Sequence, residues 1–243
     1  MSGRPVFDAS KVLAPTGRLR VGAFAGSPLS MTRDAATGEI HGLSIDLGRA
    51  FAKWLGVPFE QRDYQRIAEV LAAMKAGDVD FTISNATPAR AVDVDFSQTL
   101  ISLELGYLVP AASPIATMSD VDRSGLRIGV TQGSTSQRTI PNLLPSAVVT
   151  PAQNSGHAVE MLERHDIDLF ATNKPTLFQM ADQMPGARVL DGRWGVEHIA
   201  IAIPKDRETA LDYLRRFVEE VQTRGLLAAA VERAGLRGLV KAQ

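Results

Sequence analysis

The feature that most constrains this chain is a regular alternation of strand-like and helix-like segments, which occurs twice along its 243 residues. The first series consists of the strand-like Leu19–Ala25, the helical patterns of Ser44–Leu55 and Gln65–Lys75, and the strand-like Val79–Ser84. Strands that alternate with helices in this way form a sheet with helices on its faces. The first part of the chain is therefore predicted to be an α/β unit.

A second series of the same kind follows. Its strand-like runs are Leu126–Thr131, Ala147–Thr150 and Ile167–Thr172, and each leads into a segment with a helix start or helical spacing. Two further extended runs, Leu103–Pro110 and His198–Pro204, lie between the two series and after the second. The sequence thus predicts two α/β blocks joined by extended segments.

The chain ends in two helical patterns, Glu208–Thr223 and Leu226–Ala234, which have no strands of their own to cover. We expect them to return to the first sheet, so that the chain crosses between the blocks twice. The predicted lobes are residues 1–103 with 198–243, and residues 104–197, with crossings near 103–107 and 197–201. Two extended crossings between two sheets predict a hinge and a cleft beside it.

Composition excludes several kinds of site. The net charge is −1 with acids and bases interspersed, which argues against nucleic acid as a partner. The chain has no cysteine and its four histidines are scattered, so we expect no disulfide, no metal and no bound cofactor. The first twenty residues lack the apolar run of a secretory signal. A native start at Met1 would then place the protein in the cytoplasm.

An arginine stands where a ligand would be expected. Arg90 follows the predicted strand Val79–Ser84, and ligands of open α/β sheets lie beyond the carboxyl ends of strands. A guanidinium there can grip a carboxylate with two parallel hydrogen bonds. In the second block, residues 133–135 (Gly-Ser-Thr) follow a strand at a helix start, where backbone N–H groups and hydroxyls suit an anion. The two groups predict a carboxylate clamp, although Arg90 could instead form a surface ion pair with Asp93 or Asp95.

The order of these motifs carries a resemblance to a known family. The run Thr87–Arg90 (TPAR), the run Val94–Ser97 (VDFS) and the later VTQGSTSQ are spaced as in the bacterial solute-binding proteins of family 3, and the similarity extends over nearly the whole chain. The sequence resembles these polar-amino-acid receptors of ABC importers. The resemblance implies a two-lobed type II periplasmic-binding fold, in which each lobe is a mixed sheet flanked by helices and two hinge strands join the lobes.

The resemblance also implies a ligand site. Arg90 would hold the α-carboxylate, Ser134 and Thr135 would assist from the other lobe, and Tyr64 would form an aromatic wall. Asn85, Thr87 and Asn173 are further candidate ligand-binding residues. The implied partners are a small carboxylate ligand and the membrane subunits of an importer, with the protein a monomer. If a leader has been removed, its place would be the periplasm.

Two departures from the family pattern bear on the ligand. Asn173 stands where amino-acid receptors usually carry an acid that pairs with the ligand's ammonium, and an unpaired buried ammonium costs at least a few kcal/mol. The ligand is therefore expected to be a small carboxylate, either an amino acid or a deaminated analogue. The aromatic residue expected near residues 27–30 is also missing, since Ser, Pro, Leu and Ser occupy that stretch.

Two other functions stay open from the sequence. The cyclohexadienyl and arogenate dehydratases share this fold, and Asp63 or Glu197 could supply the acid that such an enzyme needs. A carboxyl group deep in the cleft with a raised pKa would support that alternative. The other is a cytosolic module that binds a small molecule. Because no set of nucleophile, base and orienting group is evident, a binding protein without enzymatic activity is the prediction.

Overall fold

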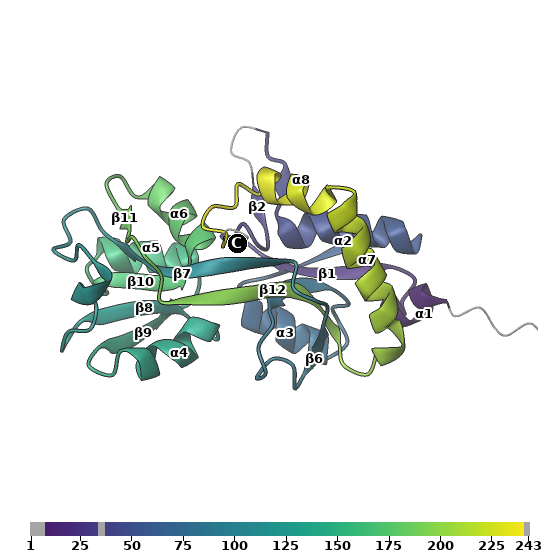
Figure 1. The fold of residues 1–243 in the computed structure, drawn as a ribbon, viewed down its shortest axis with the longest axis horizontal. Coiled ribbons are helices and arrows are strands. Elements are labelled where there is room, and N and C mark those ends of the chain that lie inside the picture. Colours follow the sequence, from purple (N-terminus) through teal and green to yellow (C-terminus); the bar gives the residue numbers. More distant parts are fainter. Residues whose placement is uncertain (1–7, 34–36, 241–243) are drawn as a thin grey trace, which may run out of the picture.

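The computed structural model describes residues 8–33 and 37–240, which form two lobes side by side (Figure 1). Two long strands, β7 (Ile101–Val109) and β12 (Gly195–Pro204), run from one lobe to the other. They pair antiparallel, with Ile101 opposite Ile199 and Leu105 opposite Gly195. β7 and β12 are thus the two extended segments that were predicted to cross between the lobes. The bounds predicted for the two lobes remain a prediction, because both strands are continuous across the junction.

The first lobe contains the first predicted α/β series. Its larger elements are α1 (Ala9–Leu13), β1 (Leu19–Phe24), α2 (Leu43–Leu55), β4 (Phe59–Tyr64), α3 (Ile67–Lys75), β5 (Thr82–Asn85) and β6 (Val94–Phe96), with the short hairpin β2 (Thr32–Arg33) and β3 (Ile40–His41). β1 pairs with β4 in parallel, while β5 and β6 pair antiparallel with β12. The amide of Gly22 donates to the carbonyl of Phe81 at 2.9 Å, which places β1 beside β5.

The second lobe repeats the arrangement. Its elements are the short 3-10 turn Met118–Asp120, β8 (Arg127–Thr131), α4 (Thr135–Leu143), β9 (Val148–Ala152), α5 (Ser155–Glu163), β10 (Leu169–Asn173), α6 (Lys174–Gln183) and β11 (Arg188–Val189). β8 pairs in parallel with both β9 and β10, whereas β10 pairs antiparallel with β7. The strand order β5-β12-β7-β10-β8-β9 joins this sheet to the first lobe through the hinge strands.

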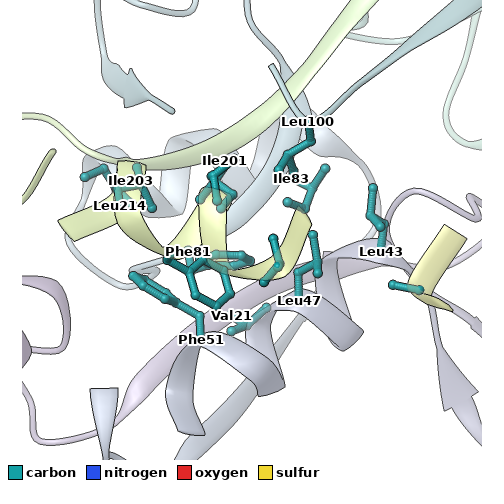
Figure 2. Close-up of a cluster of buried hydrophobic side chains, with 14 of the residues drawn as sticks. Val21, Leu43, Leu47, Phe51, Phe81, Ile83, Leu100, Ile201, Ile203 and Leu214 are labelled. Carbon is teal, nitrogen blue, oxygen red and sulfur yellow. The ribbon is translucent and has the colours of Figure 1, made fainter. Parts of the chain in front are cut away.

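The C-terminal helices return to the first lobe, as the sequence predicts. After the turn Glu208–Ala210, α7 (Leu211–Thr223) buries Leu214 and Phe217 in the same core as α2 and β5. Figure 2 shows Leu214 in this core with Phe51 of α2 and Ile83 of β5. The rings of Phe51 and Phe217 lie 4.5 Å apart and those of Phe51 and Phe81 lie 5.5 Å apart, measured between centroids. α8 (Leu226–Arg233) contacts α2 and α7. These aromatic contacts pack α7 against α2 and the residue that precedes β5 within one lobe.

The segment after α8 lies along the hinge. The amide of Glu104 donates to the carbonyl of Gly238 at 3.0 Å, and that of Val240 donates to the carbonyl of Ser102 at 2.9 Å. Arg237 forms an ion pair with Asp182 on α6 of the second lobe. The chain therefore contacts the hinge a third time, outside β7 and β12.

A buried ion network joins the sheet of the first lobe to its C-terminal part. Asp80 is fully buried and accepts hydrogen bonds from Arg20 Nε at 2.8 Å, Arg20 Nη2 at 2.9 Å and Arg207 Nη2 at 2.9 Å. Removing one partner from such a network leaves charge buried without compensation, which costs far more than the loss of an exposed ion pair.

We predict that Asp80→Asn lowers the free energy of unfolding by about 3 kcal/mol, because it leaves two buried guanidinium groups without their carboxylate. At this chain size that corresponds to a fall in Tm of roughly 6–12 °C, measurable by thermal denaturation. Asp212→Asn is the matched control, since it breaks the exposed Asp212–Arg215 pair and should cost less than about 1 kcal/mol. Equal Tm values for the two variants would show that the network contributes no stability.

Candidate functional site

A cavity of about 90 Å³ lies between the lobes at the hinge. The first lobe and the hinge contribute the carboxyl ends of β1 and β5, the start of α3, and β12. The second lobe contributes the starts of α4, α5 and α6. Its polar lining residues include Ser27, Ser30, Ser84, Asn85, Arg90, Thr131, Ser134, Thr135, Asn154, Ser155, Asn173, Thr176 and Glu197. The predicted cleft is thus a small cavity whose wall combines apolar surface with charged and polar side chains.

Arg90 reaches this cavity from the turn that follows β5. The turn is closed by the Arg90 amide, which donates to the Thr87 carbonyl at 3.0 Å and to Thr87 Oγ1 at 3.3 Å. The guanidinium folds back and donates through Nη1 to Ser84 Oγ at 2.8 Å and to the Asn85 carbonyl at 3.4 Å. Burial lowers the pKa of this guanidinium, while the charge of Glu197 acts in the opposite direction. Among the described residues, Nε and Nη2 donate no hydrogen bond, which leaves donors for a ligand.

Arg90 does not form the surface ion pairs that were its alternative role. Asp93 pairs with Lys75 at 2.6 Å, and Asp95 pairs with Lys205 at 2.6 Å. The guanidinium is instead held by neutral oxygens at the end of β5. Its charge therefore acts inside the cavity.

Three helices of the second lobe begin at the cavity. Their N-cap residues are Ser134 for α4, Asn154 for α5 and Asn173 for α6, and each caps its helix through a side-chain oxygen. A helix N-terminus carries a partial positive charge and unpaired N–H groups. Three such ends lie at the cavity that Arg90 also lines, and they favour negative charge there.

The backbone donors expected at residues 133–135 are partly occupied. The amide of Gly133 donates to Gln137 Oε1 at 2.6 Å, and that of Ser134 donates to the Thr131 carbonyl at 3.0 Å. The Ser134 hydroxyl accepts from the Gln137 amide at 3.2 Å. Ser134 therefore acts first as a helix cap, and the hydroxyl of Thr135 is the polar side-chain group of this turn that faces the hinge carboxylate.

Glu197 brings a negative charge into the cavity from the hinge strand β12. Its Oε1 accepts from Asn85 Nδ2 at 3.2 Å and from Thr135 Oγ1 at 3.4 Å, and its Oε2 accepts from Asn173 Nδ2 at 3.3 Å. Burial raises the pKa of this carboxyl, whereas Arg90 and the three hydrogen bonds lower it. Position 173 carries no acid, but the hinge strand β12 brings a carboxylate to the side chain of Asn173.

Of the other residues predicted for the site, one lines the cavity and two lie outside it. Asn85 lines the cavity and also accepts from the His198 amide through Oδ1 at 3.1 Å. Thr87 does not line the cavity and shapes the turn that carries Arg90. Tyr64 lies outside the cavity in an adjoining hollow, together with Asp63. The structure thus brings together Arg90, Asn85, Ser134, Thr135 and Asn173, but not Tyr64 or Thr87.

Several lining residues have no counterpart in the sequence-based prediction. Phe24, at the end of β1, supplies an aromatic side chain three residues before the stretch where one seemed missing. Arg66 adds a second cation, which pairs with Glu69 at 2.8 Å. Ser155 also lines the cavity. The signal for Phe24 was available, since the last residue of a strand in this fold faces the ligand edge.

The two lobes touch at the mouth of the cavity. Ser155 Oγ on α5 donates to the carbonyl of Gly26 in the first lobe at 2.9 Å. Gly133 lies so close to α3 that a Cβ atom built on it would be 2.5 Å from the Cβ of Ala68. Gly26 adopts a φ of +78°, and a Cβ there would lie 2.2 Å from Ser155 Oγ. The lobes therefore meet in a closed arrangement that depends on two small residues.

Within residues 8–33 and 37–240, no group of three or more His, Asp or Glu side chains is arranged to hold a metal ion. None of the helices in that same part of the chain is long and apolar enough to span a membrane. The charged side chains that line the cavity are Arg90, Arg66 and Glu197, and hydroxyls and amides surround them.

The chain is similar to proteins of a known family. The profile of the bacterial extracellular solute-binding proteins, family 3, matches residues 19–235. The chain is similar to a glutamine-binding protein of Geobacillus stearothermophilus, with 26% identity over 194 residues that cover 78% of this chain and 74% of that protein.

Two solved structures have a similar fold. An ancestral arginine-binding protein bound to arginine is 26% identical with a TM-score of 0.79, covering 89% of this chain and 97% of that one. The ancestral amino acid-binding protein AncCDT-1, a precursor of cyclohexadienyl dehydratase, is 24% identical with a TM-score of 0.79, covering 91% and 96%. At that identity the second likeness concerns the fold alone.

These comparisons decide between the predicted alternatives. Glu197 meets the condition set for a dehydratase, a buried carboxyl with a raised pKa, but the curated relatives are named as glutamine-binding proteins. The predictions of a type II periplasmic-binding fold and of a binding protein rather than an enzyme are therefore confirmed. This chain belongs to the bacterial extracellular solute-binding proteins, family 3.

Proposed function

We propose that this protein is the solute receptor of an ABC importer and closes around a compact solute whose carboxylate is gripped by Arg90. The observation that carries the proposal is the Arg90 guanidinium, which lies in the interlobe cavity without a carboxylate partner and faces three helix N-termini. A planar guanidinium with free donors matches the two oxygens of one carboxylate.

The cavity supports a ligand of small size. A volume of about 90 Å³ holds several water molecules, which suits an amino acid with a short side chain or its deaminated counterpart. Relatives named for glutamine and an ancestral relative bound to arginine support the amino-acid class. Tyr64 and Asp63 lie in the adjoining hollow, beyond the contact between Ser155 and Gly26.

Binding would act by closing the lobes. A ligand that touches Arg90 from the first lobe and the start of α4 or α6 from the second stabilises the closed arrangement over an open one. The shift cannot exceed the difference in the ligand's affinity for the two arrangements. The interlobe contacts of Ser155 with Gly26 and of Gly133 with Ala68 add to the stability of the closed arrangement.

The partners of this function are the ligand and the membrane subunits of an importer, which would recognise the closed monomer. The family is described as extracellular, which supports action outside the cytoplasm rather than as a cytosolic module. A receptor of this kind needs no cofactor, because closing around the solute is its whole task.

Arg90→Ala is expected to abolish solute binding. In wild type, a bound amino acid, 2-oxo acid or 2-hydroxy acid at about 100 times its Kd should add about 2.7 kcal/mol, a Tm increase of roughly 5–11 °C in a thermal-shift assay. The variant should show no increase, and Arg90→Lys should keep only a small one because an ammonium cannot form the paired hydrogen bonds.

Arg215→Ala, which removes an exposed arginine, serves as the control and should retain the full shift. A ligand-induced shift that survives in Arg90→Ala would refute the carboxylate grip. A large fall in the Tm of the ligand-free variant would point to a structural role for Arg90 instead.

Ser155→Ala is expected to weaken the affinity for the solute by about 5-fold, because one net hydrogen bond between the lobes contributes about 1 kcal/mol. Titration calorimetry measures the change. Ser146→Ala, at an exposed position of the second lobe, is the matched control and should leave Kd unchanged. An unaltered Kd in Ser155→Ala would mean that the contact at the mouth does not contribute to closure.

A further inference from the structure

Glu197 carries a buried carboxylate. The proposed binding of the solute's carboxylate by Arg90 does not explain why a second negative charge lies in the same cavity. The Glu197 side chain lies on β12 with the residue only 8% exposed, and it lines the same cavity as Arg90. Within the described part of the chain, it is the one Asp or Glu among the residues that line this cavity. A charge in such a place needs compensation, either from the protein or from what binds there.

The protein compensates Glu197 only with neutral donors. Asn85, Thr135 and Asn173 reach the two carboxylate oxygens at 3.2–3.4 Å, at the long end of hydrogen-bond distances. A carboxylate has room for about four hydrogen bonds, and Oε2 accepts only the one from Asn173 within the described structure. One acceptor position therefore remains on the oxygen nearer to α6.

Arg90 does not neutralise this charge by direct contact. Its guanidinium donates to Ser84 and to the backbone of Asn85, and no ion pair between Arg90 and a carboxylate is formed in the described chain. The cavity thus holds a partly buried guanidinium, that of Arg90, and a buried carboxylate, that of Glu197, and both are incompletely paired. A solute that carries a carboxylate and an ammonium on adjacent atoms would satisfy the two together.

We propose that Glu197 receives the α-ammonium of the solute while Arg90 holds its carboxylate, so that the ligand is a zwitterionic α-amino acid with a short side chain. This inference rests on the proposed receptor function. Asn85 from one lobe and Asn173 from the other hold the carboxylate in place. The ammonium therefore meets a charge that both lobes orient, and deaminated acids bind much more weakly.

A purely structural role for Glu197 is the competing explanation. Its hydrogen bonds connect β5, α4 and α6, so it could tie the lobes together without touching a ligand. The two roles differ in one respect. A tie would affect amino acids and deaminated acids alike, whereas an ammonium site affects only the ligand that carries the ammonium.

The experiment measures Kd by titration calorimetry for L-α-amino acids and for the matched L-2-hydroxy acids, such as alanine with lactate and serine with glycerate. Wild type should prefer the amino acid by about 100-fold or more. Glu197→Gln keeps the shape and should weaken amino-acid binding by a similar factor, while binding of the hydroxy acid changes by less than about 3-fold. Far-UV circular dichroism and the ligand-free Tm check that the variant folds.

A charge-relocation variant sharpens the test. Asn173 Nδ2 lies 3.3 Å from Glu197 Oε2, so an aspartate at position 173 places a carboxylate on the same wall. The double variant Glu197→Gln with Asn173→Asp should recover most of the preference for the amino acid. A structural tie through Glu197 would not be restored by that second change.

The outcomes separate the two proposals. Wild type that binds hydroxy acids as tightly as amino acids, or Glu197→Gln that keeps the full preference, overturns the ammonium site and leaves the receptor function standing. Absence of binding by every acid of both series overturns the receptor function and the inference with it. Recovery in the double variant supports the inference.

Lowering the pH gives a measurement on wild type that needs no variant. Burial raises the pKa of Glu197, and the charged group acting on it is Arg90, since Asn85, Thr135 and Asn173 are neutral. Protonation of Glu197 removes the counter-charge, so affinity for the amino acid should fall as the pH is lowered through that pKa. Affinity for the hydroxy acid should not follow the same titration, and equal pH profiles for both ligands would contradict the proposal.

Discussion

The antiparallel pairing of β7 with β12 is the interaction on which the rest of the structure depends. Residues 195–199 of one strand pair with residues 101–105 of the other, and the ladder continues into β5 on one side and β10 on the other. Backbone hydrogen bonds in such a ladder cannot stretch, so the strands can bend or twist but cannot slide. The lobes can therefore rotate about the junction, and a ligand bound beside it moves both lobes at once.

The two lobes share a local arrangement of strand, ion pair and terminal asparagine beside this junction. Val79–Asn85 and Ile167–Asn173 correspond position by position, and in each the second residue is an aspartate that pairs with the arginine at the start of a neighbouring parallel strand, Arg20 or Arg127. Each run ends in an asparagine whose amide donates to Glu197. The repeated ion pair fixes where each strand begins, and the strand length then fixes where its terminal amide lies. A single carboxylate on the hinge is thereby held from both sides.

Local patterns made most of the fold and part of the site predictable. Helical and strand periodicities lie within short stretches, and Arg90 is positioned by a turn that begins three residues earlier at Thr87. The hydrogen-bond partners of Glu197 could not be predicted from local patterns, because its partner Asn85 lies 112 positions away in the sequence. The position of Tyr64 has a related cause, since the adjoining hollow that it lines is also lined by α5 and α6 of the other lobe. Which side chains share a cavity thus depends on how the lobes dock, which sequence spacing does not record.

The segment that follows α8 lies where a reporter group could detect movement at the hinge. Gly238 and Val240 bond to the backbone of β7, and Arg237 pairs with Asp182 on the far lobe, so this part of the chain lies across the joint. The close packing of Gly238 on Lys174, where a Cβ atom would approach within 2.4 Å, leaves little freedom there. A fluorophore attached at residue 240 would consequently sit beside the moving parts. This end of the chain is therefore suited to an optical sensor whose signal follows lobe rotation.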